Sequence, residues 1–491
     1  MPCHIRAAPE GAYDSIRKMP NFMLIVSYAS IRLGAAMAIL ALGLAFLPKV
    51  QANAGEPPQI STRTLDNGLT VIVKPDARAP VVVSMVWYRV GSVDEVSGIT
   101  GVSHVLEHMM FKGTEKIPDG EFSNLVSRAG GRSNAFTSRD YTAYHQQLRS
   151  SELALSFELE ADRMAGLRMT DAEFSKELRV VMEERRQRIA DNPQALVYEQ
   201  LLATALTEHA YRVPIIGWMN DLERMKLAQV QAWYDSWYLP NNALVVVVGN
   251  VEPKNVFALA QRFFGAIPPK ALTARRDQKE PEQLGLKRIE VKAAAKLPFV
   301  AMAYRVPSLR DIEQDWEPYA LSVLSGVLDG YAAARLERAL VRASRVADSI
   351  DTSYDGYALG PGLFYISGTP AAGKTAAQFE MAWRDQLDRL VREGIDEQEL
   401  RRVKAQVVSA YVYRQDSMFS QASQIGRLHS VGLPYDAGDV FVRRLQEITV
   451  EQVRAVAEKY LIDDNLTVAV LNPQPPDDAA RSGEEANDAT R

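Results

Sequence analysis

The chain has 491 residues, 47% hydrophobic and 24% charged, which is the composition of a globular protein long enough for two or three domains. Its formal net charge is −5, and its lysines and arginines form no long runs, so the composition argues against a nucleic acid partner. The single cysteine, Cys3, lies so close to the N-terminus that the bulk of the chain can form no disulfide bond.

An uncharged apolar run at residues 33–47 follows Arg32 and precedes Ala52-Asn53-Ala54, an A-x-A cleavage pattern. The arrangement predicts a signal peptide over residues 1–54 and export to the periplasm or out of the cell. A membrane anchor is the alternative, but the run is shorter than the roughly 20 residues that a spanning helix needs, so we expect no stable anchor. Residues 1–22 are long for the segment before such a run, which leaves the true start codon open.

Strands and helices are expected to alternate from residue 60 onward. A strand, a turn at Asp66-Asn67-Gly68 and a second strand over 69–74 predict a hairpin. A strand over 81–90 and a helix over 98–111 follow. This alternation predicts an α+β fold.

The chain also contains an internal repeat. The segment that begins at Tyr238 and runs into a strand over 245–248 matches the segment that begins at Tyr460, 222 residues later, and runs into a strand over 467–471. The offset is about one domain length, so we expect two related domains in tandem.

Composition sets the expected domain boundaries. Residues 268–285 are rich in proline, lysine, arginine and glutamate, which is typical of a solvated connector. After Pro473 the chain has almost no apolar side chains, which predicts a disordered tail. The expected segments are an N-terminal domain over 55–270, a linker over 271–288, a C-terminal domain over 289–473 and a tail over 474–491.

The sequence His104-Val105-Leu106-Glu107-His108 is the strongest chemical signal. His104 and His108 lie four residues apart in a predicted helix, so they share one face at a spacing that suits two ligands of one zinc ion. Glu107 lies on nearly the same face, where it could act as a general base on a metal-bound water. A catalytic zinc needs a third protein ligand from elsewhere.

A capping-box pattern over Thr170–Glu173 predicts the start of a glutamate-rich helix. Glu177 and Glu184 are two turns apart and share a face with Val180 and Val181. This face is expected to pack inward and to present carboxylates to a buried cation. A solvated charged helix is the alternative that these residues alone leave open.

Three further segments, Gly130–Thr137, His209-Ala210-Tyr211 and Ile216-Gly217, complete a pattern with the histidine and glutamate motifs. On these residues, and over about residues 60–472, the chain resembles the pitrilysin or insulinase family of zinc peptidases, which includes the mitochondrial processing peptidases. The resemblance implies two homologous α/β-sandwich domains of the LuxS/processing-peptidase-like type, with one zinc ion per chain.

In that family the third ligand is a glutamate some 75 intervening residues after the second histidine. Glu184 has this spacing from His108, so the resemblance selects Glu184, with Glu183 as the alternative. Glu177 matches a family acid that supports the metal site without binding the metal.

The segment Arg132–Thr137 matches an edge strand to which substrate adds in the family by main-chain hydrogen bonds. The residues that this implies as substrate contacts are Asn134, Ala135 and Phe136. The alternative is an ordinary interior strand pair over 134–145, in which the aromatic residues serve as packing and His145 is structural.

The second domain has no His-x-x-Glu-His and only one histidine, His429, so we expect one active site per chain. Many relatives complete the site with an arginine and, seven residues later, a tyrosine that face the zinc across a chamber of four domains. Arg342 matches the arginine, but Ser349 stands at the tyrosine position. The resemblance therefore implies a partner subunit, either a paralogue in a heterodimer or a second copy in a homodimer.

These observations predict a zinc-dependent endopeptidase that hydrolyses peptides or unfolded polypeptides. A non-catalytic peptide-binding or assembly subunit of a peptidase-like heterodimer is the alternative, and the intact His104, Glu107 and His108 argue against it. A mitochondrial presequence-processing enzyme would share the fold, but it would begin with an arginine-rich amphipathic segment in place of the apolar run. The substrate is not readable from these residues.

Overall fold

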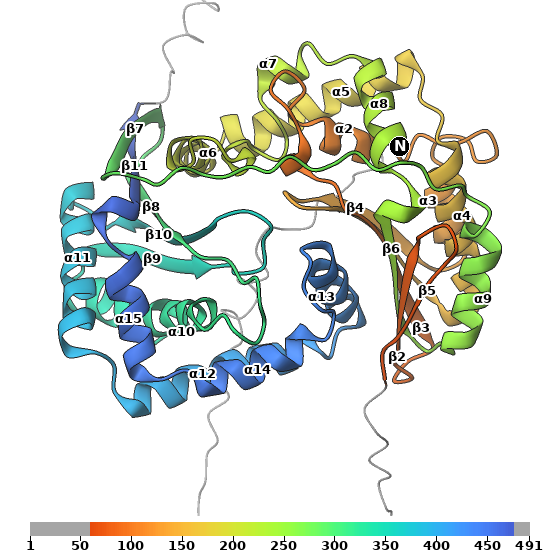
Figure 1. Cartoon of the computed structure of the whole chain (residues 1–491). Coiled ribbons are helices and arrows are strands. Elements are labelled where there is room, and N and C mark those ends of the chain that lie inside the picture. Colours follow the sequence, from red (N-terminus) through yellow and green to blue (C-terminus); the bar gives the residue numbers. More distant parts are fainter. Residues whose placement is uncertain (1–58, 476–491) are drawn as a thin grey trace, which may run out of the picture. The chain divides into compact units, whose positions relative to one another are not determined.

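Two β-sheets form the centres of the two halves of the chain in the computed structural model, which describes residues 59–475 (Figure 1). The strand order is β1-β2-β6-β3-β5-β4 in the first sheet and β7-β11-β8-β10-β9 in the second. Both sheets carry helices, so the predicted α+β class with two domains in tandem is confirmed. The predicted signal peptide and nearly all of the predicted tail lie outside the described residues.

The first sheet pairs β2 with β6 in parallel and its other neighbours antiparallel. Its central strand, β6, is apolar along its whole length because both of its faces are buried. The strand β4 lies at the edge of the sheet that the described residues form, so the alternative of an interior strand pair over 134–145 does not hold for β4. The strands are β1 (Ser61–Thr64), β2 (Thr70–Pro75), β3 (Val81–Tyr88), β4 (Arg132–Thr137), β5 (Thr142–Arg149) and β6 (Ala243–Gly249).

The second sheet repeats this arrangement, with β7 and β11 parallel and the other neighbours antiparallel. The repeated segments at Tyr238 and Tyr460 occupy equivalent places, since each lies between a helix and the strand that enters the sheet beside its parallel partner. The strands are β7 (Lys287–Ala294), β8 (Phe299–Val306), β9 (Ala347–Tyr354), β10 (Gly362–Pro370) and β11 (Leu466–Gln474).

Helices of the first half cover one face of the first sheet and share its largest core (Figure 1). They are α2 (Val102–Met109), α3 (Glu121–Arg128), α4 (Leu153–Gly166), α5 (Asp171–Arg185), α7 (Met219–Leu222), α8 (Leu227–Trp237) and α9 (Pro253–Phe264). The remaining helix of this half, α6 (Pro193–Ala205), packs against the second sheet. The helix predicted over 98–111 is shorter than expected, because Gly98 and Gly101 both have positive φ and form a turn before it.

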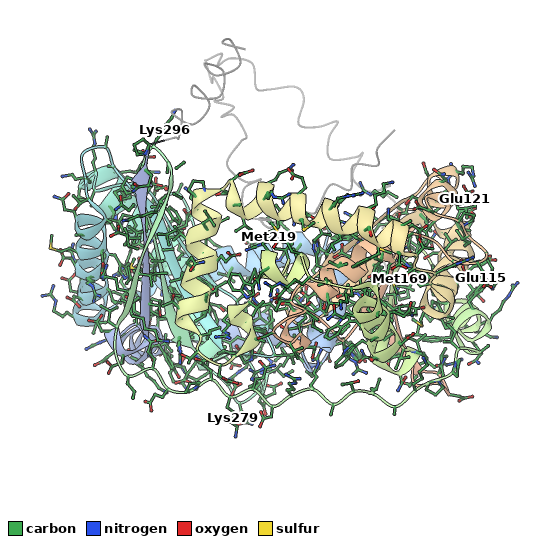
Figure 2. All side chains as sticks on the ribbon, turned by 90° about the horizontal axis from the view of Figure 1, so that it is seen from above. Glu115, Glu121, Met169, Met219, Lys279 and Lys296 are labelled. Atoms are coloured by element: carbon green, nitrogen blue, oxygen red, sulfur yellow. The ribbon has the colours of Figure 1, made fainter. Side chains whose placement is uncertain are left out.

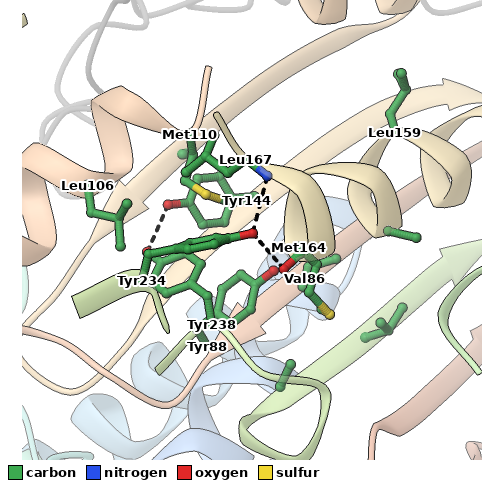
Figure 3. Close-up of a cluster of buried hydrophobic side chains, with 14 of the residues drawn as sticks. Val86, Tyr88, Leu106, Met110, Tyr144, Leu159, Met164, Leu167, Tyr234 and Tyr238 are labelled. Carbon is green, nitrogen blue, oxygen red and sulfur yellow. Dashed lines mark hydrogen bonds between the residues drawn. The ribbon is translucent and has the colours of Figure 1, made fainter. Parts of the chain in front are cut away.

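Three tyrosines in this core, Tyr144, Tyr234 and Tyr238, satisfy their hydroxyl groups internally, as Figure 3 shows. Tyr144 and Tyr238 share a hydrogen bond of 2.9 Å, and Tyr234 donates to the carbonyl of Met164 at 2.8 Å. Leu106 and Met110, on and just after α2, belong to the same core. One side of α2 is therefore fixed by a buried apolar layer, which leaves its histidines on another side.

The second half contributes α10 (Glu317–Asp329), α11 (Ala376–Glu393), α12 (Glu397–Arg414), α13 (Met418–Ser430), α14 (Ala437–Glu447) and α15 (Val450–Tyr460). One helix of each half packs on the sheet of the other half. Ala422 and Ile425 of α13 pack on the free face of the first sheet, and Val197 and Leu201 of α6 pack on a face of the second. The two sheets therefore belong to one unit, which begins at Ile60.

The predicted linker over 271–288 is more tightly held than a solvated connector. The carboxylate of Glu280 accepts hydrogen bonds from the main-chain N–H groups of residues 207–209 and pairs with Arg305 at 2.8 Å. Its neighbour Lys279 is exposed and points outward (Figure 2), and strand β7 already begins at Lys287. The segment is thus an extended strap with alternating anchored and exposed side chains.

None of the helices within residues 59–475 is both long enough and apolar enough to cross a membrane.

Candidate active site

The helix α2 is held at its N-terminus by two buried carboxylates. Glu95 accepts the N–H groups of Gly101 and Ser103 at 2.7 and 2.9 Å, and Asp221 accepts the N–H and the hydroxyl of Thr100 at 3.2 and 2.6 Å. These groups satisfy N–H groups that a helix start leaves without partners. Burial raises the pKa of Glu95 to about 8.

Gly101 is required at this start. It has a φ of +86°, and a Cβ atom there would lie 2.4 Å from the main-chain oxygen of Ile216. The close approach brings the Ile216-Gly217 segment against the beginning of α2. The family-like motif at Ile216-Gly217 therefore serves to position the histidine helix.

His104, His108 and Glu184 come together between α2 and α5, with ligand atoms that all lie within 4.8 Å of one another. The Oε2 atom of Glu184 is 3.7 Å from Nε2 of His104 and 3.4 Å from Nε2 of His108. Glu184 reaches them because Thr170 caps α5 as predicted, accepting the N–H of Glu173 at 3.2 Å, and so sets where the helix begins.

The three side chains create a strongly polar environment in a buried place. Burial and the neighbouring His108 lower the pKa of His104 to about 3. Burial also lowers the pKa of His108, but hydrogen bonds to Glu177 and Glu184 outweigh it and raise that pKa to about 9. The carboxylates thus stabilise a positive charge at the centre of the cluster.

A zinc ion fits this donor set. Two imidazole nitrogens and one carboxylate oxygen form a ligand combination that catalytic zinc sites use, and a divalent cation would supply the positive charge that the carboxylates stabilise. Within residues 59–475 no other cluster of histidine, cysteine, aspartate or glutamate has this spacing.

Glu177 lies behind His108, on the side away from Glu184. Its Oε2 is 3.4 Å from Nδ1 of His108, and its Oε1 pairs with Lys112 at 2.7 Å. Such a carboxylate orients an imidazole ligand and fixes which nitrogen faces the metal. The pair is largely buried, with side-chain exposures of 7% for Glu177 and 16% for Lys112.

Glu107 is 7% exposed, and its Oε2 accepts a hydrogen bond of 2.6 Å from the hydroxyl of Thr137. Burial raises the pKa of Glu107, while His108 and the Thr137 hydroxyl act in the opposite direction. Thr137 is the last residue of edge strand β4, so this edge of the first sheet ends beside the Glu107 carboxylate. Asn134, Ala135 and Phe136 lie on the same strand.

Several residues singled out from the sequence lie elsewhere. Glu183 is 55% exposed and pairs with Arg186, and Val180 is 45% exposed, so the expectation that Val180 packs inward is wrong. The rotation between successive helical residues places both on the outer side of α5, whereas Val181 is fully buried. Arg342 is 58% exposed and contacts Glu337 of its own helical turn at 3.4 Å.

The sequence analysis assigned no individual role to three residues near the cluster: Thr137, Lys112 and Arg188. Lys112 lies four residues after His108, and Arg188 lies four residues after Glu184 and pairs with its Oε1 at 3.0 Å. Both could have been found by extending the helical spacing of the ligands by one turn. The contact of Thr137 with Glu107 links two distant segments and has no such local signal.

Comparisons with known proteins agree with this arrangement. Residues 70–217 match the family described as Insulinase (Peptidase family M16), and residues 224–407 match the domain described as Peptidase M16 inactive domain. The zinc motif lies in the first matched segment. The second matched segment covers most of the half that lacks the motif.

Among similar proteins, the zinc protease PqqE of Helicobacter pylori is 31% identical over 422 residues, or 85% of this chain and 93% of that protein. The mitochondrial-processing peptidase subunit beta of Blastocladiella emersonii is 24% identical over 463 residues, or 91% of this chain and 95% of that subunit. A crystal structure of a protease from Helicobacter pylori superimposes with a TM-score of 0.81 at 29% identity, covering 85% of this chain and all of that one.

Proposed function

Because the chain belongs to the insulinase family of peptidases (M16), we propose that it is a zinc-dependent endopeptidase that hydrolyses peptides or unfolded polypeptides. One observation carries the proposal: two imidazoles and a carboxylate converge beside a second, buried carboxylate, that of Glu107. His104, His108 and Glu184 would hold one zinc ion. The buried Glu107 would serve as the general base.

Zinc bound by these three residues would lower the pKa of a bound water and polarise the peptide carbonyl. Glu107 would take the proton from that water and pass it to the departing amine, so the reaction needs no covalent intermediate. Glu177, held by Lys112, would keep His108 oriented toward the metal. Arg188 would hold the oxygen of Glu184 that does not face the histidines.

The edge strand β4 supports a peptide substrate. Its outer side could pair with an extended chain through main-chain hydrogen bonds, and such pairing is tolerant of sequence. Its end at Thr137 lies against Glu107, so a peptide added along Asn134, Ala135 and Phe136 would reach the catalytic carboxylate.

A partner subunit is part of the proposal. Arg342 is turned to solvent and engaged by Glu337, and Ser349 lies in strand β9, so neither contributes to the cluster within the chain. The resemblance to a subunit of the mitochondrial processing peptidase supports an assembly in which a paralogue supplies both the arginine and the tyrosine of the site. The apolar run at 33–47 and the Ala52-Asn53-Ala54 pattern support export to the periplasm.

The test begins with the chain from residue 55, its zinc content by elemental analysis, and cleavage of a quenched peptide library with and without a paralogous partner. Glu107→Gln keeps all ligands but removes the base, and Glu183→Gln changes an exposed carboxylate one residue from Glu184. We expect one zinc per chain in all three proteins and loss of cleavage in Glu107→Gln alone. Bound zinc without cleavage, even with the partner, would favour a peptide-binding subunit instead.

A further inference from the structure

The hydroxyl of Thr137 makes a contact that the general mechanism does not require. It donates a hydrogen bond of 2.6 Å to Oε2 of Glu107, a short distance for a hydroxyl and a carboxylate. The two residues are 30 positions apart and come from different elements, β4 and α2. The hydrogen bond therefore joins the sheet edge to the carboxylate that would act as base.

The alternation of side chains along β4 decides which residues can make this contact. Ala135 is 5% exposed and belongs to the core beneath α2, whereas Phe136 packs on the opposite face, 5.5 Å from the ring of Trp87. Thr137 points to the same side as Ala135, toward α2. A one-residue shift of β4 would put a different side chain beside Glu107.

The strand end is itself fixed. Thr137 is paired with Thr142 of β5, and the N–H of Ser138 donates to the carbonyl of Tyr141 at 2.8 Å. The position of Thr137 is thus set by the sheet and not by the loop that follows.

We propose that Thr137 is a positioning residue that orients the carboxylate of Glu107 for proton transfer and ties this orientation to the strand that receives substrate. The inference rests on the proposed peptidase function. With Oε2 engaged by Thr137, Oε1 would be the oxygen left to take the proton from the attacking water. No bond to Thr137 forms or breaks during the reaction.

The chemistry of the hydrogen bond predicts which kinetic constant depends on it. A hydroxyl that donates to a carboxylate stabilises one orientation of that carboxylate, and the effect is stronger than between two neutral groups. Substrate adds to the main chain of β4, which a side-chain change at Thr137 leaves in place. Loss of the hydroxyl should therefore lower kcat and leave KM nearly unchanged.

The test uses two variants at Thr137 and one control. Thr137→Val removes the hydroxyl but keeps the shape and the preference for a strand, and Thr137→Ser keeps the hydroxyl. Thr142→Val removes a hydroxyl from the strand directly opposite without touching Glu107. Steady-state kinetics on one peptide are measured for all three, together with zinc content and melting temperature.

We expect Thr137→Val to lower kcat by roughly 10- to 100-fold with KM and zinc content unchanged. Thr137→Ser should restore kcat to within about threefold of the parent, and Thr142→Val should keep the parent kcat, because the first retains the hydrogen bond and the second does not involve it. An unchanged kcat in Thr137→Val, or a loss that Thr137→Ser does not repair, would overturn the proposal.

A second measurement separates this inference from the peptidase proposal. Crystals of the zinc-loaded parent and of Thr137→Val show where the Glu107 carboxylate lies, whether or not either protein cleaves peptides. A carboxylate that turns away from the metal in Thr137→Val supports the positioning role. An identical Glu107 in both crystals contradicts that role even if the parent is an active peptidase.

Discussion

Apart from β1, which only the first sheet has, the two halves of the chain share one sheet topology, but the helices that follow β3 and β8 differ in their chemistry. In the first half this helix is α2, with His104, Glu107 and His108; in the second half it is α10, whose buried side chains are nearly all apolar. The helix α12 packs against α10 as α5 packs against α2. A common framework therefore supports a polar centre on one side and an ordinary core on the other.

One glutamate of α5, partly exposed, and one of α12, buried, show what the difference means physically. Glu184 of α5 faces two histidines, whereas Glu399 of α12 accepts two hydrogen bonds, of 2.7 and 2.8 Å, from the guanidinium of Arg335. One oxygen of the first carboxylate pairs with Arg188, and the other faces two imidazoles that a metal can bridge. Both oxygens of the second are engaged by one guanidinium within the protein, which leaves none for a cation.

The strongest test of the comparison is to replace each of these two glutamates by glutamine. Glu184→Gln should lose zinc and lower cleavage by more than roughly 100-fold, a larger loss than expected for a residue that only supports a ligand. Glu399→Gln should keep zinc and cleavage but lower the melting temperature by roughly 5 °C, because Arg335 is left without its partner. Zinc content and thermal unfolding of both variants decide this. Loss of zinc in Glu399→Gln would break the comparison.

A smaller effect is expected at Lys112, which holds Glu177 behind His108. Lys112→Met should weaken zinc binding by roughly 10- to 100-fold, because Glu177 would no longer be fixed against the imidazole. Lys116→Met is the matched control, since that side chain is 82% exposed and pairs with Asp162 away from the cluster. Competition with a chelator measures both affinities. Equal affinities in the two variants would show that Lys112 does not act on the metal site.

The smallest effect is expected on the free energy of unfolding, at the place where α13 of the second half packs on the first sheet. A Cβ atom at Gly426 of α13 would lie 2.1 Å from the indole of Trp87, a fully buried side chain of the first sheet. Gly426→Ala should cost about 1–3 kcal/mol of stability, because the ring cannot move without disturbing the core. Gly166→Ala, at the end of α4 where the nearest atom is 4.0 Å away, should be nearly neutral. Equal unfolding free energies would mean that α13 adjusts freely on the sheet.

Much of the fold followed from local signals. The turn at Asp66-Asn67-Gly68, the apolar strand over 245–248 and the cap at Thr170 were each readable within a few residues and lie where expected. The repeat at Tyr238 and Tyr460 indicated two related domains. The sequence did not predict that α6 and α13 each pack on the sheet of the other half, because an amphipathic helix does not reveal which of two sheets it will cover.

The candidate site divides in the same way. The helical spacing of His104, Glu107 and His108 places them on one face from sequence alone, while the choice of Glu184 needed the family resemblance. That Val180 would be buried was inferred from its neighbours and is wrong, because one helical step separates it from the inward face.

The sequence by itself determined the elements and the donor types: a helix with two imidazoles and a carboxylate, a capped helix with four glutamates, and a strand-like segment after Gly130-Gly131. Only the tertiary structure decided which glutamate meets the histidines and that Thr137 reaches Glu107. The reason is that spacing within a helix follows from covalent geometry, whereas a contact between α2, α5 and β4 depends on how whole layers pack.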